Sequence, residues 1–178
     1  MKTSSCKRFT LIELLVVIAI ILILAGLVFP ALGTVRNNAK KSRANTECQS
    51  LKTALIMYES EFSCWPATGS KDGYVTNYKE MCELLTGQNG KKMVFYEVGV
   101  GYDKSQGILD PWGKPYRVIL DFDFNGKIDG VSDVGTINKA YGRNDSDIRS
   151  KVAVYSYGDK DKTNVSDLAT SRKIVISW

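Results

Sequence analysis

The sequence predicts an α+β protein in which one long N-terminal helix carries a small domain that contains β-strands. Residues 14–29 include no charged side chain, and apolar residues then recur at helical spacing as far as Phe62. Farther along, apolar or aromatic residues stand at every second position of 116–124, and most of the residues between them are charged. This period of two is typical of a half-buried strand. Residues 151–157 and 172–178 are further candidate strands. Several strands packed on one long helix give the α+β class.

The first apolar stretch, residues 9–32, is long enough to cross a bilayer, because about 20 mainly apolar residues span the hydrocarbon core as a helix. Lys2, Lys7 and Arg8 precede it and are expected to stay on the cytoplasmic side. Glu13 is the one charged residue within the stretch. Placing a carboxylate inside a membrane span is unfavourable in free energy. Glu13 is therefore predicted to have a functional role and a positively charged partner from another chain.

The helical pattern continues beyond the apolar stretch. Residues recurring at spacings of three and four form one apolar stripe, which predicts a core-packing face: Ala44, Cys48, Leu51, Leu55, Tyr58 and Phe62. A helix over residues 9–62 would be roughly 80 Å long at about 1.5 Å per residue. Between this helix and the first strand, we expect a loop over 64–76, a short helix capped by Asn77 with Glu80, a strand over 93–98 and a loop over 99–107. The polar segment 129–150 predicts a long surface loop.

Two separate stretches resemble one family. The basic leader 1–8, the Phe-Thr-Leu-Ile-Glu start at 9–13, the apolar helix and Pro30 resemble the N-terminus of type IV pilins and of the pseudopilins of type II secretion. The sequence Asp-Pro-Trp-Gly-Lys-Pro-Tyr at 110–116 is similar to the stretch that leads into the β-sheet of major pseudopilins, which favours the secretion branch. Its two prolines and its glycine predict a fixed turn.

The resemblance implies a type IV pilin-like fold with a small antiparallel sheet. It divides the chain into a leader (1–8), a transmembrane half of the helix (9–32) and a soluble domain (33–178) that includes the second half of the helix. It also implies cleavage between Arg8 and Phe9 by a prepilin peptidase, methylation of the Phe9 amine, and assembly into a filament through Glu13. In this chain Arg8 stands where the family usually has glycine.

The same resemblance places the protein in the bacterial inner membrane as a single-pass subunit, with its C-terminal domain in the periplasm. The implied partners are further copies of the chain, other pseudopilins and the inner-membrane assembly platform of a pseudopilus. A type IV pilin subunit and a membrane-anchored, calcium-stabilised binding module are the alternatives. An ordinary signal anchor is disfavoured because it has no use for Glu13.

Composition narrows the possible functions. The chain has no histidine, which removes the commonest general base and metal ligand and disfavours an enzyme. The formal charge is +5, and acidic and basic residues are interspersed, so no nucleic-acid partner is indicated. Of the four cysteines, Cys6 lies in the leader and Cys48 on the packing face of the helix. Cys64 and Cys82 are the better pair for a disulfide in an oxidising compartment, with free thiols as the alternative.

One constellation has metal-binding spacing. Asp121, Asp123, Asn125 and Asp129, with Gly126 at the turn, match the front of an EF-hand-type calcium loop, to which Lys127 would add its carbonyl. The final bidentate acid of that pattern is Ser132 here, and Asp133 comes one residue late. The alternative interpretation is a β-hairpin with a type I′ turn at Asn125-Gly126.

A second group of acids lies nearer the C-terminus. Asp159, Asp161 and Asp167, followed by the terminal Trp178, resemble the loop in which major pseudopilins bind calcium, in an imperfect register. If calcium is bound, the 121–129 segment is the favoured site and this C-terminal segment is the alternative.

Overall fold

The computed structural model describes residues 10–69, 71–98, 101–103, 106–158 and 174–178. The chain forms two compact units, Met1–Ala39 and Lys40–Trp178. Its elements in order are α1 (Leu11–Phe62), β1 (Gly73–Tyr74), α2 (Tyr78–Leu85), β2 (Tyr102–Asp103), β3 (Gly107–Ile108), β4 (Arg117–Leu120), α3 (Ser132–Ala140), β5 (Val152–Ser156) and β6 (Val175–Ile176). The predicted α+β class, with a long N-terminal helix and a small antiparallel sheet, is confirmed.

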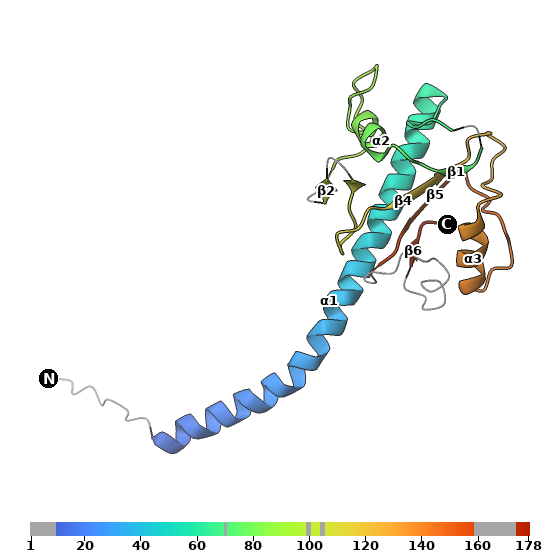
Figure 1. Cartoon of the computed structure of the whole chain (residues 1–178). Helices are drawn as coiled ribbons and strands as arrows, with labels where there is room; N and C mark the ends of the chain where they lie inside the picture. The colour runs from blue at the N-terminus through green and yellow to red at the C-terminus, as the bar shows by residue number, and fades with distance from the viewer. Residues whose placement is uncertain (1–9, 70, 99–100, 104–105, 159–173) are drawn as a thin grey trace. The chain divides into compact units, whose positions relative to one another are not determined.

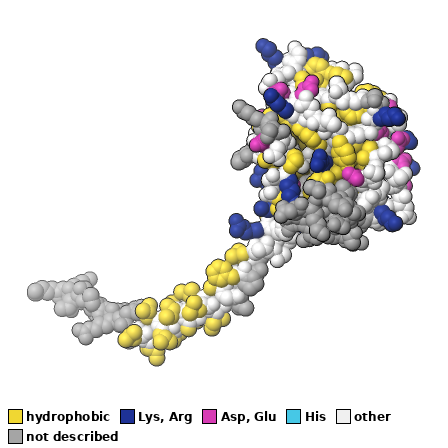
Figure 2. All heavy atoms as spheres, viewed as in Figure 1, with side chains coloured by type: hydrophobic (Ala, Val, Ile, Leu, Met, Phe, Trp, Pro, Cys, Tyr) yellow, Lys and Arg dark blue, Asp and Glu magenta, His cyan; other side chains and the backbone are white. Residues whose placement is uncertain are grey.

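Helix α1 runs for 52 residues and continues through Pro30. In the part of α1 that belongs to the first unit, the large apolar side chains from Leu11 to Leu24 are exposed. On the face drawn in Figure 2 this helix shows hydrophobic side chains, whereas charged side chains are scattered over the second unit. Among the described residues, no helix reaches the length and hydropathy that a membrane crossing needs.

The sheet of the second unit has the order β1-β4-β5-β6, and every neighbouring pair is antiparallel (Figure 1). Its centre is the pair β4–β5, in which Val118 lies opposite Val154 and Leu120 opposite Val152. A separate two-stranded ribbon joins β2 and β3. The predicted strands 116–124, 151–157 and 172–178 are confirmed as shorter elements, β4, β5 and β6.

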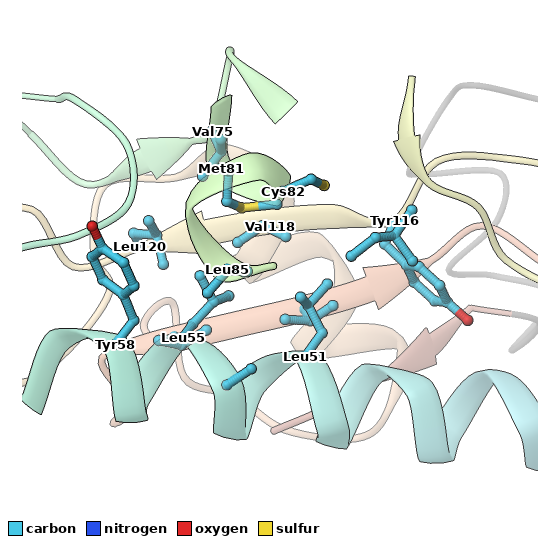
Figure 3. Close-up of a cluster of buried hydrophobic side chains, with 14 of the residues drawn as sticks. Leu51, Leu55, Tyr58, Val75, Met81, Cys82, Leu85, Tyr116, Val118 and Leu120 are labelled. Atoms are coloured by element: carbon cyan, nitrogen blue, oxygen red, sulfur yellow. The ribbon is translucent and has the colours of Figure 1, made fainter. Parts of the chain in front are cut away.

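One face of the sheet packs on α1 and α2. Leu51, Leu55 and Tyr58 of α1 point toward the sheet and α2 in Figure 3, which confirms the predicted apolar stripe as a core face. Strands β4 and β5 supply alternate residues to this cluster: Val118, Leu120, Val152 and Val154. Helix α2 supplies its buried residues: Met81, Cys82 and Leu85. All of these side chains are buried.

The opposite face of the sheet carries a second core. Ile119, Ala153 and Tyr155 are the intervening residues of β4 and β5, and they pack with Val134 and Ile137 of α3. The expectation of a surface loop over 129–150 was therefore wrong, because a helix in this segment covers the sheet. The prediction that the strand at 116–124 is half-buried was wrong for the same reason, since both faces of β4 are enclosed.

The predicted turn at 110–116 is organised by one buried carboxylate. Asp110 accepts hydrogen bonds at Oδ1 from the backbone N–H groups of Trp112 and Lys114, both at 2.9 Å. Its Oδ2 accepts from the Ser156 hydroxyl at 2.5 Å, which ties the turn to β5. Gly113 adopts φ +83° within the turn, a conformation that glycine tolerates best.

Three other local expectations have mixed outcomes. The short helix is capped as predicted, since the Asn77 side chain accepts from the Glu80 backbone N–H. Residues 93–98 form no strand; only Val94 makes an isolated bridge, to Thr86. The Cys64–Cys82 disulfide is not formed, because Cys82 faces the core from α2 while Cys64 is exposed beyond α1, and both are free thiols.

Adjacent residues of α1 provide a test of this packing. Leu55→Ala should lower the free energy of unfolding by about 2–5 kcal/mol, because it leaves a cavity at a side chain that is 0% exposed. Ile56→Ala, at a position that is 38% exposed, is the matched control and should cost less than about 1 kcal/mol. Denaturant unfolding of both variants, followed by tryptophan fluorescence, would show equal losses if the stripe were not the core face.

Candidate functional site

The first described residues form the N-terminal cap of α1. Thr10 precedes the helix, and its hydroxyl accepts a hydrogen bond from the Glu13 backbone N–H at 3.3 Å. The Glu13 carboxylate reaches back and accepts from the Thr10 backbone N–H at 2.8 Å and from its hydroxyl at 2.7 Å. This reciprocal arrangement is a capping box, in which two helix-end donors are satisfied.

The cap gives Glu13 a role that the sequence interpretation missed, although the signature Thr-x-x-Glu was present. Within the chain the carboxylate is held over the first turn of α1, where a negative charge also favours the helix dipole. The side chain remains exposed, so it can still meet a group from another molecule. The predicted processing residues Arg8 and Phe9 lie outside the described residues.

The candidate metal loop follows directly from β4. Asp121 is 0% exposed, and its two carboxylate oxygens accept from the backbone N–H groups of Asn125 at 3.2 Å and Gly126 at 2.8 Å. The Trp65 indole donates to the Asp121 carbonyl at 2.6 Å and fixes the start of the loop. Gly126 turns the chain with φ +88°.

The next two predicted ligands lie on the exposed side of the same loop. Asp123 accepts from the Asn125 backbone N–H at 3.1 Å and from its side-chain amide at 3.0 Å. Asn125 in turn accepts from the Lys127 backbone N–H at 2.9 Å. These bonds fold residues 121–127 into a compact loop, and no β-hairpin forms there, because β4 pairs with β1 and β5 instead.

A third acid, Asp72, joins the cluster from the loop before β1. Its Oδ1 accepts from the Phe122 backbone N–H at 3.1 Å, and its Oδ2 accepts from the Asp129 backbone N–H at 2.9 Å. One ligand oxygen from each of Asp72, Asp121 and Asp123 lies within 4.8 Å of the others. The sequence gives no sign of Asp72 as a ligand, since only the pairing of Gly73 with Leu120 brings it opposite Asp121.

The other predicted acids are engaged elsewhere. The Asp129 carboxylate forms an ion pair with the Lys127 ammonium at 2.6 Å. Asp133 accepts from the Tyr74 hydroxyl at 2.5 Å in the first turn of α3. The alternative ligands Asp159, Asp161 and Asp167 lie outside the described residues.

The three clustered carboxylates form a negatively charged site of hard oxygen donors. Burial raises the pKa of Asp121 above its ordinary value of 3.8, and Asp123 and Asp72 raise it further, while the N–H groups of Gly126 and Asn125 lower it. Ionised carboxylates so close together repel one another, and a bound cation would relieve that repulsion. Oxygen-only donors suit calcium or magnesium better than zinc or copper.

Sequence comparisons with known proteins place the chain in a family. The chain is 34% identical to type II secretion system core protein G of Aeromonas hydrophila over 122 residues, which is 68% of this chain and 77% of that protein. It is 33% identical to the protein of the same name from Pseudomonas aeruginosa over 119 residues, covering 67% and 77% of the two chains. The chain belongs to the core protein G family of pseudopilins.

A pilus protein also shows similarity. Fimbrial protein EcpB of Eikenella corrodens is 34% identical over 100 residues, 56% of this chain and 63% of that protein. No protein-family model and no solved structure matches the chain.

Membership in this family gives the described features their meaning. A pseudopilin is a structural subunit and not an enzyme, so the exposed apolar helix and its capped start are candidate contact surfaces for other subunits. The acidic loop is then a candidate for stabilising the second unit, with no catalytic step to perform.

Proposed function

We propose that this pseudopilin is a filament subunit of the periplasmic pseudopilus of a type II secretion system. Residues 9–32 would anchor it in the bacterial inner membrane by a single pass, with its C-terminal domain in the periplasm. The observation that carries the proposal is an α1 whose large apolar side chains from Leu11 to Leu24 are exposed. Such a surface requires a membrane or neighbouring helices to cover it.

Assembly also requires processing and partners. A prepilin peptidase would cut between Arg8 and Phe9, and methylation of the new amine would follow. The mature helix would then leave the membrane with the help of the inner-membrane assembly platform and join other pseudopilins. The basic leader, the apolar helix and the names of the relatives support this sequence of steps.

Glu13 would set the register of assembly. In a bundle of apolar helices, its carboxylate would pair with the amine of Phe9 from a neighbouring subunit. Any other stagger would leave an unpaired charge in a low-dielectric environment, which is strongly unfavourable. The capping box supports this role, because it holds the carboxylate at the end of the helix where a neighbour's amine could reach it.

Two alternatives remain as outcomes of the tests. The similarity to fimbrial protein EcpB favours a type IV pilin as the second candidate. A membrane-anchored binding module would differ from both, because it would stay monomeric and bind a ligand through its second unit.

We further propose that calcium stabilises the second unit at Asp72, Asp121 and Asp123, with Asn125 and the Lys127 carbonyl nearby. Asp129 would have to leave its ion pair with Lys127 to join as a ligand. The ion would offset the repulsion among the three carboxylates and fix the loop that follows β4. The C-terminal acids Asp159, Asp161 and Asp167 are the alternative ligands.

The mature N-terminus tests the processing step. In assembled material the chain should begin at Phe9 and carry one methyl group on its amine, as measured by intact mass and N-terminal peptide analysis. The proposal depends on a junction with Arg8 at the cut. Filaments built from chains that retain residues 1–8 would contradict it.

Substitutions at Glu13 separate its charge from its capping role. Glu13→Gln keeps a side chain that can complete a capping box but removes the charge, so it should insert in the membrane and fail to form filaments. Thr10→Ala is the matched control: it removes the cap hydroxyl, retains the charge, and should still assemble, at a cost of about 0.5–2 kcal/mol in helix stability. Normal filaments from Glu13→Gln, seen by electron microscopy, would refute the charge pairing.

Calcium binding is tested by thermal unfolding in calcium and in chelator. Calcium at about 100 times its dissociation constant should stabilise the chain by about 2.7 kcal/mol and raise its Tm. The rise should be smaller at acid pH: the pKa of Asp121 is raised, so its carboxyl takes up a proton as pH falls, and only the ionised form binds the metal.

Two aspartate variants locate the ion, and a third is the control. Asp123→Ala should abolish the calcium-dependent rise in Tm, whereas Asp145→Ala, at an exposed acid outside the cluster, should retain it. Retention of the rise in Asp123→Ala with its loss in Asp161→Ala would place the ion in the C-terminal segment instead. Equal Tm values for the wild-type chain in calcium and chelator would rule out both sites.

A further inference from the structure

Among the described residues of the second unit, large apolar side chains are exposed on α1 (Ile56 and Met57), just after α3 (Tyr141), and in two loops. Met93 and Val94 lie together in the loop after α2, with 41% and 59% of their surfaces exposed. Phe124 is 47% exposed in the loop after β4. Both loops border the segment where α1 ends, since Lys91 pairs with Glu61 and Phe124 stacks on Trp65.

The loop after α2 is held in shape from within. The buried Asn89 side chain donates to the carbonyls of Leu84 at 2.7 Å and Met93 at 2.6 Å, and accepts from the Met93 backbone N–H at 3.0 Å. This clamp leaves Lys91, Lys92, Met93 and Val94 exposed as a basic and apolar surface. Because the loop is already held in this shape, binding a partner would cost little conformational entropy.

The loop after β4 has the complementary chemistry. Phe124 stacks on Trp65 with ring centroids 5.9 Å apart and planes at 8°, which supports the exposed ring from below. It adopts φ +58°, an uncommon conformation for a bulky residue. The exposed Asp123 and the half-buried Asp72 flank it. The result is an aromatic side chain set among negative charges.

We propose that these surfaces form a head-to-tail contact between copies of this chain, the 91–94 loop of one subunit docking on the Phe124 loop of the next. The inference rests on the proposed filament function. A contact that joins two different patches of the same chain generates an open helical filament, whereas a patch that meets itself generates a closed dimer. Opposite charges would fix the register of the loops, and the apolar side chains would bury one another.

The charge match persists whether or not the acidic loop holds a cation. Three ionised carboxylates outweigh one divalent ion, so the loop stays negative in both states. Lys91 also pairs with Glu61 of its own α1, which leaves the exposed Lys92 as the better partner for Asp123.

Cysteine cross-linking in assembled full-length chains tests the contact. In a Cys64→Ser background, the remaining thiols of the described chain, Cys48 and Cys82, are buried. A chain carrying both Met93→Cys and Phe124→Cys should give a ladder of dimers, trimers and larger species when diamide oxidises facing thiols to disulfides. Each single variant should remain monomeric, and a mixture of the two should stop at dimers.

The outcomes separate the geometries. Filaments of the double variant without a ladder would overturn the proposed contact, as would dimers of either single variant, which would show a symmetric contact. A matched control pairs Met93→Cys with Asn144→Cys, at an exposed position in the segment after α3. An equal ladder from this control would also overturn the proposal.

A second measurement uses the wild-type sequence and therefore does not depend on how the variants assemble. Filaments grown from mixed ¹⁵N-labelled and unlabelled chains are treated with a carbodiimide, which joins an amine to a carboxylate with loss of water. Mixed-isotope peptides linking Lys92 to Asp123 or Asp72 would support the contact. Filaments that form without such peptides would overturn the contact but leave the proposed filament function standing. Failure of the wild-type chain to form filaments would instead overturn the proposed function, and this contact with it.

Discussion

The pairing of β4 with β5 is the constraint on which the second unit depends. Their residues alternate between two cores, so Val118 and Val154 face α1 while Ile119 and Tyr155 face α3. A strand enclosed on both faces has one permitted register, because a slip by one residue would exchange the two sets of side chains. The same pair fixes where α1 and α3 can pack.

The pairing of β1 with β4 also completes the candidate metal site. Because β1 and β4 are antiparallel and Gly73 lies opposite Leu120, Asp72 lies beside Asp121. The acids are thus gathered at the end of the sheet by strand pairing, and the backbone N–H groups of the loop hold them there. Repulsion among these clustered carboxylates lowers the stability of the folded chain, and a bound cation would offset that repulsion.

The first unit differs, because its described large apolar side chains from Leu11 to Leu24 are exposed and form no core among the described residues. Local bonds determine only how its helix begins: Thr10 and Glu13 satisfy each other's donors and acceptors. The exposed carboxylate therefore stands ready for a partner without being left unsatisfied in the isolated chain. In the proposed filament, the same carboxylate would pair with a neighbouring subunit and favour one register.

The sequence by itself determined the features that depend on near neighbours. Helical spacing predicted α1 to Phe62, the side chain of Asn77 predicted the start of α2, and the motifs around Phe9 and Asp110 indicated the family. Tertiary structure alone decided the burial of the second sheet face, the presence of α3 in a segment with a loop-like composition, and the joining of Asp72 to the acidic loop. These depend on contacts between segments far apart in the chain, which leave no periodic pattern in either segment.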